Sequence, residues 1–177
     1  MIMLSSTYSM SAISDSPIID PKSRFHPVYS RAGMVVSQEV IASRIGADIL
    51  ALGGNAVDAA VATGFALAVT LPRAGNLAGG GFMLIHLTRE SKTIALDFRE
   101  VAPARASRDM FLNLHGEVDN QLARSSIKSS GVPGTVAGLL HAHEKYGQLP
   151  LKQVIQPAID LASKGIIVNV DLAHSIV

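Results

Sequence analysis

The sequence contains no cysteine. This absence excludes disulfide bonds, a cysteine nucleophile and metal sites built from thiolates. It does not indicate a compartment, because a chain without thiols is compatible with both oxidising and reducing surroundings.

Charge is also scarce. Charged residues make up 16% of the chain and the formal net charge is +1. A chain with so little net charge lacks the basic surface that binds nucleic acid, so nucleic-acid binding is set aside. It also has no acidic run of the kind that indicates a disordered tail. The hydrophobic fraction is 48% of 177 residues, which is enough to bury a substantial core in one domain or in one piece of a larger domain.

Long apolar runs are missing too. The longest one, "AAVATGFALAVTLP", starts at Ala59 and is ended by Pro72, short of the roughly 20 residues that a membrane span needs. It therefore predicts a buried helix and no membrane span. Residues 1–24 are rich in serine and lack the cationic start and sustained apolar run of a good signal peptide. We expect them to be a disordered leader or a signal-peptide remnant, and residues 25–177 to form an incomplete domain.

The first folded segment predicts a short strand, "GMVVS" at 33–37, followed by two helices. Ser37 is expected to cap the first helix, which should end at Gly53-Gly54. Its buried stripe has the spacing of one helical face: Ile41, Ile45, Ile49 and Leu52. Asn55 and Asp58 form a capping box at the start of the second helix, and the short link makes the two helices neighbours.

The remaining segments predict an antiparallel hairpin and further helices, hence an α+β fold. "FMLIHL" and "TIALDFR" are strand-like and are joined by the polar "TRESK". Residues 105–130 are polar and predict an irregular surface segment. "TVAGLLHAHEKYG" predicts a helix ending at Gly147, and in the next helix Pro157 is expected to cause a kink or a division. The last segment with helical periodicity, "VNVDLAHSIV", is still incomplete where the chain ends, so we expect the chain to be the front of a longer protein.

A glycine cluster, "AGNLAGGGF", occupies residues 74–82. A strand follows it, and it has neither a Walker lysine nor the G-x-G-x-x-G spacing, so phosphate binding is disfavoured. Its glycines 79–81 permit positive φ angles or a close backbone approach, which serves either packing or a site. The segment "SSGVPGTVAG" at 129–138 has two interpretations. Thr135 and the N-terminus of the following helix could bind an anion, or Pro133 could serve only as a rigid entry into a packed helix.

The histidines do not predict a metal site. His141 and His143 lie two apart on a predicted helix and so face different sides, which indicates a solvated helix surface. His86 lies in a strand without an acidic partner at ligand spacing and is interpreted as an ordinary sheet histidine.

Asp97, Arg99 and Glu100 end the second predicted strand. Residues two apart on a strand share a face, so Asp97 and Arg99 are expected to point the same way. One interpretation is a surface ion pair worth about 0 to 1 kcal/mol. The other is that a neighbouring carboxylate fixes a guanidinium whose planar fork binds a substrate carboxylate.

Six blocks of the sequence, taken together, resemble one family. They occur in this order: "FHPVYSRAGMVVS", "GGNAVDAAVATGFALAV", "AGNLAGGGFMLIHL", "LDFREVAPARASRDMF", "SSGVPGTVAGL" and "KYGQLPLKQVIQPAIDLASKGIIV". From about residue 25 to the end, the chain resembles the N-terminal part of the large subunit of the γ-glutamyltransferase (γ-glutamyltranspeptidase) family.

The resemblance implies the αββα sandwich of an N-terminal-nucleophile hydrolase, of which this chain would form only the N-terminal portion. It implies a precursor that cuts itself and a small subunit whose new N-terminal threonine attacks the γ-glutamyl amide of glutathione or a similar donor. The γ-glutamyl group then passes to an amino acid, a peptide or water. The resemblance implies no cofactor and no metal, and a periplasmic or secreted location.

The resemblance also assigns roles to the charged residues after the second strand. Arg99 matches the family arginine that binds the donor α-carboxylate, and Asp97 and Glu100 are expected to hold it in place. Ala78 departs from the family, which commonly has a glycine there. The threonine nucleophile is expected beyond Val177, so no catalytic residue is expected in this chain and the chain alone is predicted to be inactive.

Two alternatives to this activity remain. One is a non-catalytic scaffold or binding module derived from the family. The other is a related acylase or poly-γ-glutamate hydrolase that shares the arginine block.

Overall fold

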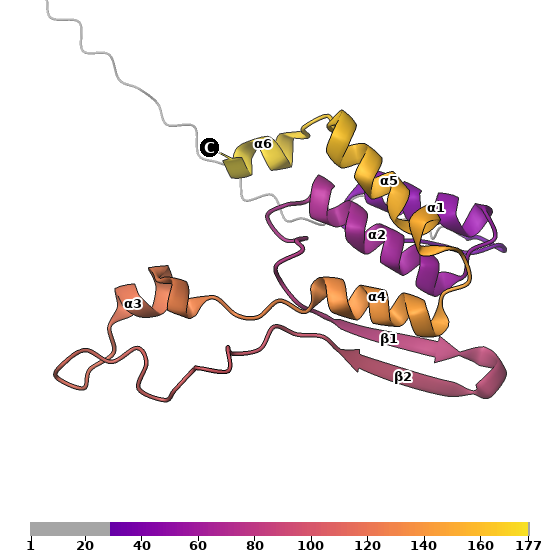
Figure 1. Cartoon of the computed structure of the whole chain (residues 1–177). Helices are drawn as coiled ribbons and strands as arrows, with labels where there is room; N and C mark the ends of the chain where they lie inside the picture. The colour runs from indigo at the N-terminus through magenta and orange to yellow at the C-terminus, as the bar shows by residue number, and fades with distance from the viewer. Residues whose placement is uncertain (1–28, 177) are drawn as a thin grey trace, which may run out of the picture. The chain divides into compact units, whose positions relative to one another are not determined.

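The computed structural model describes residues 29–176, and its helices and strands all lie within the unit Ala32–Val177. The leader predicted at residues 1–24 lies outside the described residues. In chain order the elements are α1 (Val40–Ala51), α2 (Ala56–Thr70), β1 (Phe82–Leu87), β2 (Lys92–Asp97), α3 (Asn120–Ser125), α4 (Thr135–Tyr146), α5 (Leu151–Lys164) and α6 (Val170–Ile176) (Figure 1). The predicted α+β class, helices with an antiparallel hairpin, is confirmed.

The hairpin has one packed face and one exposed face. Its strands pair antiparallel, with Phe82 opposite Asp97 and Leu87 opposite Lys92, and a 3-10 turn joins them. Ile85 belongs to the hydrophobic core, whereas Phe82 and Leu84 on the other face are 65% and 76% exposed. Alternation along β1 therefore orients the hairpin against the helices.

Helix α2 is the centre of the core. Helices α1, α4 and α5 pack against it, and α4 also contacts β2, so that α4 lies between α2 and the hairpin (Figure 1). Each of these elements contributes buried apolar side chains, among them Ile49, Val61, Ile85, Leu139 and Val154. None of the helices in residues 29–176 combines the length and apolar character that crossing a lipid bilayer requires.

The seam between α1 and α2 is made by small residues. Ala42 and Gly46 are buried, and an added Cβ at Gly46 would overlap the Thr63 side chain of α2. The predicted stripe is wrong at Leu52, which follows the last helical residue as the C-cap and is 59% exposed, whereas Ile49 is buried as predicted. Close approach of two helices favours small side chains over a continuous row of isoleucines.

The start of α1 differs from the prediction in two respects. Residues 33–37 form no strand, since the described sheet has two strands and neither pairs with them. The N-cap is Glu39, whose Oε2 accepts a hydrogen bond from the Ala42 N–H at 2.9 Å, and not Ser37. The Ser37 hydroxyl instead donates to the Glu39 carbonyl oxygen at 2.8 Å.

The Glu39 carboxylate should make stability depend on pH. Burial raises the pKa of Glu39, but hydrogen bonds from first-turn backbone N–H groups outweigh burial and hold the pKa below its ordinary value of 4.5. A lowered folded-state pKa stabilises the fold above the unfolded pKa, and this stabilisation is lost as the pH falls through the folded pKa. We expect Glu39→Gln to cost about 1 kcal/mol at neutral pH and less well below pH 4.5.

Urea unfolding of the parent and variant chains at the two pH values measures this difference. Glu144→Gln, at an exposed position of α4, is the matched control and should have no effect at either pH. An equal loss for Glu39→Gln at both pH values would contradict the expectation.

The capping box at α2 is confirmed, and it does more than cap. Asp58 is fully buried, and its carboxylate accepts hydrogen bonds from the backbone N–H groups of Asn55 at 2.9 Å and Gln148 at 3.0 Å. His143 Nε2 lies 3.5 Å from Asp58 Oδ1 and 2.9 Å from the Leu149 carbonyl oxygen. The interpretation of His143 as a solvated surface residue is therefore wrong: its ring helps to join α2 to the α4–α5 connection.

The segment after the hairpin contains a helix that the sequence pattern did not predict. Helix α3 begins after Asp119, whose Oδ1 accepts from the N–H groups of Gln121 and Leu122, both at 2.9 Å. Reciprocal hydrogen bonds between Val101 and Val132 close the base of the segment, which runs out from the helices and returns (Figure 1). Helix α5 continues through Pro157 without division.

Candidate functional site

The candidate site lies where β2 ends. The Phe98 N–H donates to the Gly81 carbonyl at 3.0 Å and the Gly81 N–H donates to the Phe98 carbonyl at 3.4 Å, which extends the hairpin pairing by one residue pair. Strand structure stops at Asp97, so the predicted strand is wrong for its last two residues. Arg99 therefore lies on a loop that begins at the end of a fixed strand.

Asp97 and Arg99 do not form the predicted side-chain pair. Asp97 Oδ1 accepts a hydrogen bond from the Arg99 backbone N–H at 3.0 Å, which fixes the turn and not the guanidinium. The guanidinium pairs with Glu100 instead, with 3.6 Å between Arg99 Nε and Glu100 Oε1. Because strand alternation has ended, adjacent residues can meet in this way.

The Arg99 side chain is 63% exposed and that of Glu100 is 41% exposed. An exposed ion pair of this kind contributes about 0 to 1 kcal/mol, so it holds the guanidinium only weakly. Within residues 29–176 no other carboxylate lies within 4.0 Å of the guanidinium. Its planar fork therefore remains available to bind an incoming carboxylate through two parallel hydrogen bonds.

The glycine cluster packs against the backbone of the Arg99 loop. An added Cβ at Gly80 would lie 2.7 Å from Arg99 Cα and would overlap the backbone nitrogen of Glu100. Positive φ angles are not needed here, since the described glycines with positive φ lie elsewhere: Gly33, Gly53, Gly116 and Gly165. The cluster thus acts through close approach, and it supports the site by packing.

The glycine cluster also pairs with backbone N–H groups at the start of α4. The Gly79 carbonyl oxygen accepts hydrogen bonds from the N–H groups of Gly134 at 2.8 Å and Thr135 at 3.0 Å. These two N–H groups are therefore already paired and are not free to meet an anion. The Phe98 ring lies against Gly138 of α4.

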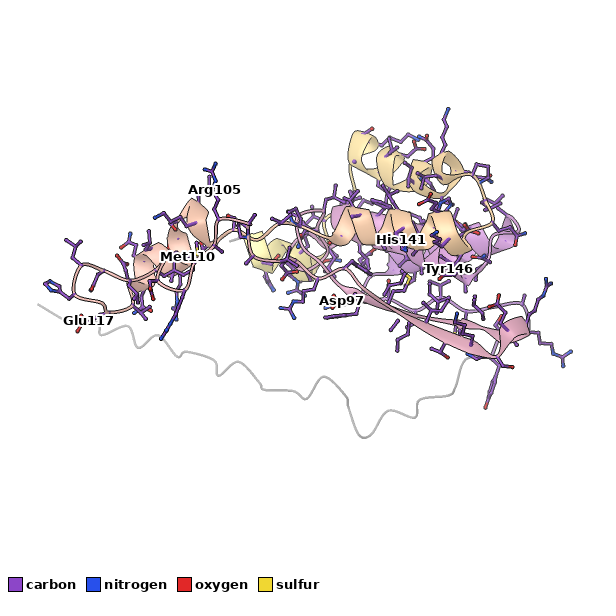
Figure 2. The ribbon with its side chains drawn as sticks, turned by 60° about the horizontal axis from the view of Figure 1, so that its bottom comes forward. Asp97, Arg105, Met110, Glu117, His141 and Tyr146 are labelled. Carbon is purple, nitrogen blue, oxygen red and sulfur yellow. The ribbon has the colours of Figure 1, made fainter. Side chains whose placement is uncertain are left out.

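An open cavity of about 360 Å³ lies in front of the loop. Its lining includes Arg99, Glu100 and Pro103 from the loop, Met110 from the segment that leads away from β2, and Lys128 from the segment that returns toward α4. Figure 2 shows Met110 on the segment that leads away from Asp97. Arg99 thus lines a concave space.

Gly80→Ala is expected to destabilise the chain by about 1–3 kcal/mol, because the new methyl group would overlap backbone atoms that cannot move independently. Urea unfolding of the variant chain measures this loss. Gly131→Ala is the matched control: its Cβ would lie 3.4 Å from the Glu100 side chain, an ordinary contact, and should cost much less. Equal stability of the two variants would contradict the packing role.

The described residues contain no group of three or more histidine, aspartate or glutamate side chains placed to hold a metal ion. His86 forms a hydrogen bond with Thr93, with 3.0 Å between Nδ1 and Oγ1, as expected of a sheet histidine. Among the described residues, the cavity next to Arg99 is therefore lined by charged side chains, Arg99, Glu100 and Lys128, and not by a cluster of metal ligands.

Comparison with known proteins identifies the family. The family model of gamma-glutamyltranspeptidase matches residues 42–177. The chain belongs to the gamma-glutamyltranspeptidase family. The crystal structure of Helicobacter pylori gamma-glutamyltranspeptidase is similar, with a TM-score of 0.81 and 46% identity over 85% of this chain and 43% of that chain. The predicted fold, the N-terminal portion of an N-terminal-nucleophile hydrolase, is confirmed.

Curated relatives in this gamma-glutamyltranspeptidase family carry two kinds of name. A glutathione hydrolase proenzyme of Escherichia coli (strain K12) is 56% identical over 152 residues, which is 86% of this chain and 26% of the relative. An acylase proenzyme, ACY 1 of Pseudomonas sp. (strain V22), is 39% identical over 156 residues, or 85% of this chain and 28% of the relative. The chain therefore spans about a quarter of the length of these relatives.

Proposed function

We propose that this chain is the N-terminal part of the large subunit of a γ-glutamyltransferase, and that it supplies the arginine that binds the γ-glutamyl donor. The observation that carries the proposal is Arg99: in a member of this family, this residue lines an open cavity, and its backbone is held by a hydrogen bond to Asp97 and by packing against the glycine cluster. The name of the Escherichia coli relative, glutathione hydrolase proenzyme, supports glutathione as a donor.

In this proposal Arg99 binds the α-carboxylate of the donor through two hydrogen bonds and so fixes which end of the glutamyl group faces the nucleophile. Asp97 positions the Arg99 backbone and Glu100 restrains its side chain. Neither contacts the reacting atoms.

The chemistry lies on sequence beyond Val177. The threonine hydroxyl adds to the γ-carbonyl carbon, its proton passes to the threonine α-amino group, and the donor amine leaves with a proton. Water or an acceptor amine then attacks the acyl enzyme and releases glutamate or a new γ-glutamyl amide. No metal or cofactor takes part.

The partner in this proposal is the small subunit cut from the same precursor, a reading supported by the word proenzyme in the names of the relatives. We propose a periplasmic or secreted location, with residues 1–24 as the leader and residues 25–177 as the start of the folded subunit.

The test uses the full-length protein of which this chain is part. Mass spectrometry should find two subunits, the smaller one beginning with threonine, and the processed protein should release glutamate from glutathione. An uncut protein without this activity would contradict the proposal and favour a non-catalytic scaffold.

The second candidate function is that of an acylase or a poly-γ-glutamate hydrolase. The acylase relative, at 39% identity against 56% for the glutathione hydrolase, is the observation in its favour. A processed protein that cleaves amides lacking a glutamyl α-carboxylate, and that does not hydrolyse glutathione, would favour the acylase function.

A further inference from the structure

A second cation lines the cavity next to Arg99. Lys128 belongs to the 3-10 turn Ile127–Ser129, on the segment that returns toward α4. Sequence reasoning did not single it out, because a lone lysine in a polar segment has the pattern of an ordinary surface residue.

The fold fixes Lys128 near Arg99 through the backbone. The Val101 N–H donates to the Val132 carbonyl at 3.2 Å, and the Val132 N–H donates to the Val101 carbonyl at 2.8 Å. One residue along, an added Cβ at Gly131 would lie 3.4 Å from the Glu100 Cβ. The turn that carries Lys128 is thus tied to the loop that carries Arg99, and both residues border one concave space.

The charges on this cavity do not balance. Its lining contains two cations, Arg99 and Lys128, and one carboxylate, Glu100, which pairs with Arg99. Among residues 29–176 no carboxylate lies within 4.0 Å of the Lys128 ammonium. Of the two cations that line the cavity, Arg99 is paired with Glu100, and Lys128 has no carboxylate partner among residues 29–176.

We infer that Lys128 binds a second carboxylate of the donor, so that the site prefers γ-glutamyl donors with a free carboxylate beyond the scissile amide over otherwise identical neutral ones. This inference rests on the proposed function. A planar guanidinium fork accommodates one carboxylate, whereas an ammonium on a flexible four-carbon stem can reach across an open cavity to another. The proposed preference is electrostatic and falls with ionic strength.

Two donors of nearly the same shape test the inference: glutathione and its ethyl ester at the glycine carboxylate. The processed full-length protein should show a KM about threefold to fivefold lower for the acid than for the ester, the range that one exposed ion pair supports. Lys128→Met should remove this difference by raising the KM for the acid alone, and Lys128→Arg should retain most of it. Lys152→Met, at an exposed position of α5, is the control and should change neither KM.

The outcomes separate this inference from the proposed function. A parent protein that hydrolyses neither donor ends the proposed function, and the inference falls with it. A parent protein that hydrolyses both donors, with Lys128→Met shifting the two KM values equally or not at all, overturns the inference and leaves the proposed function intact. Persistence of the preference in high salt would also overturn it.

Discussion

Replacing Arg99 by alanine in the full-length protein is expected to raise the donor KM about tenfold to a hundredfold. A hydrogen-bonded pair between charged groups contributes about 1.5 to 3 kcal/mol, and each 1.4 kcal/mol corresponds to a factor of ten. Self-cleavage should survive, because in the proposed function the guanidinium binds the donor and takes no part in cutting the precursor. Steady-state kinetics with glutathione, together with gel analysis of processing, measures both effects.

Arg99→Lys sharpens the same experiment. Lysine keeps the positive charge but loses the planar fork, so its KM should lie between those of the parent and the alanine variant. Arg44→Ala, at an exposed position of α1, is the matched control and should behave like the parent. Donor kinetics for Arg99→Ala equal to those of the parent would contradict the assigned role.

Replacing Asp58 by alanine is expected to lower the free energy of unfolding of the chain by about 2–4 kcal/mol. The fully buried carboxylate accepts hydrogen bonds from the backbone N–H groups of Asn55, Gln148 and Leu149. Its removal takes away a helix cap and leaves partly buried donors without acceptors, and both losses carry a cost. Denaturant unfolding followed by circular dichroism measures the change.

Two variants make the Asp58 result specific. Asp58→Asn keeps one acceptor oxygen and should lose less stability than the alanine variant. Asp48→Ala, at an exposed position of α1, should stay within about 0.5 kcal/mol of the parent. A stability for Asp58→Ala equal to that of Asp48→Ala would mean that the carboxylate does not join α2 to the α4–α5 connection.

Patterns that depend on local chemistry predicted the corresponding parts of the fold. The capping box of Asn55 and Asp58, the hairpin and the end of α4 at Gly147 follow from residue spacing and turn chemistry, and the structure contains all three. The N-cap at Glu39 was missed, because glutamate is an uncommon cap and Ser37 has the more usual side chain. Helix α3 is short, but Asp119 before it was a usable signal.

Local sequence patterns could not predict the features that depend on tertiary contacts. Alternation along a strand predicted Asp97 beside Arg99, but β2 ends at Asp97 and Glu100 becomes the partner. Similarly, only the fold shows that the glycine cluster serves both the Arg99 loop and the start of α4. The roles of Arg99, Asp97 and Glu100 toward a donor came from the family resemblance and remain proposals.

A crystal structure of the processed full-length protein with glutamate bound tests the role of Arg99 most directly. We predict two hydrogen bonds of about 2.7–2.9 Å from the Arg99 guanidinium to the α-carboxylate of glutamate, with the γ-carboxyl group beside the threonine. A guanidinium directed into solvent, with the α-carboxylate of glutamate held by other residues, would contradict it.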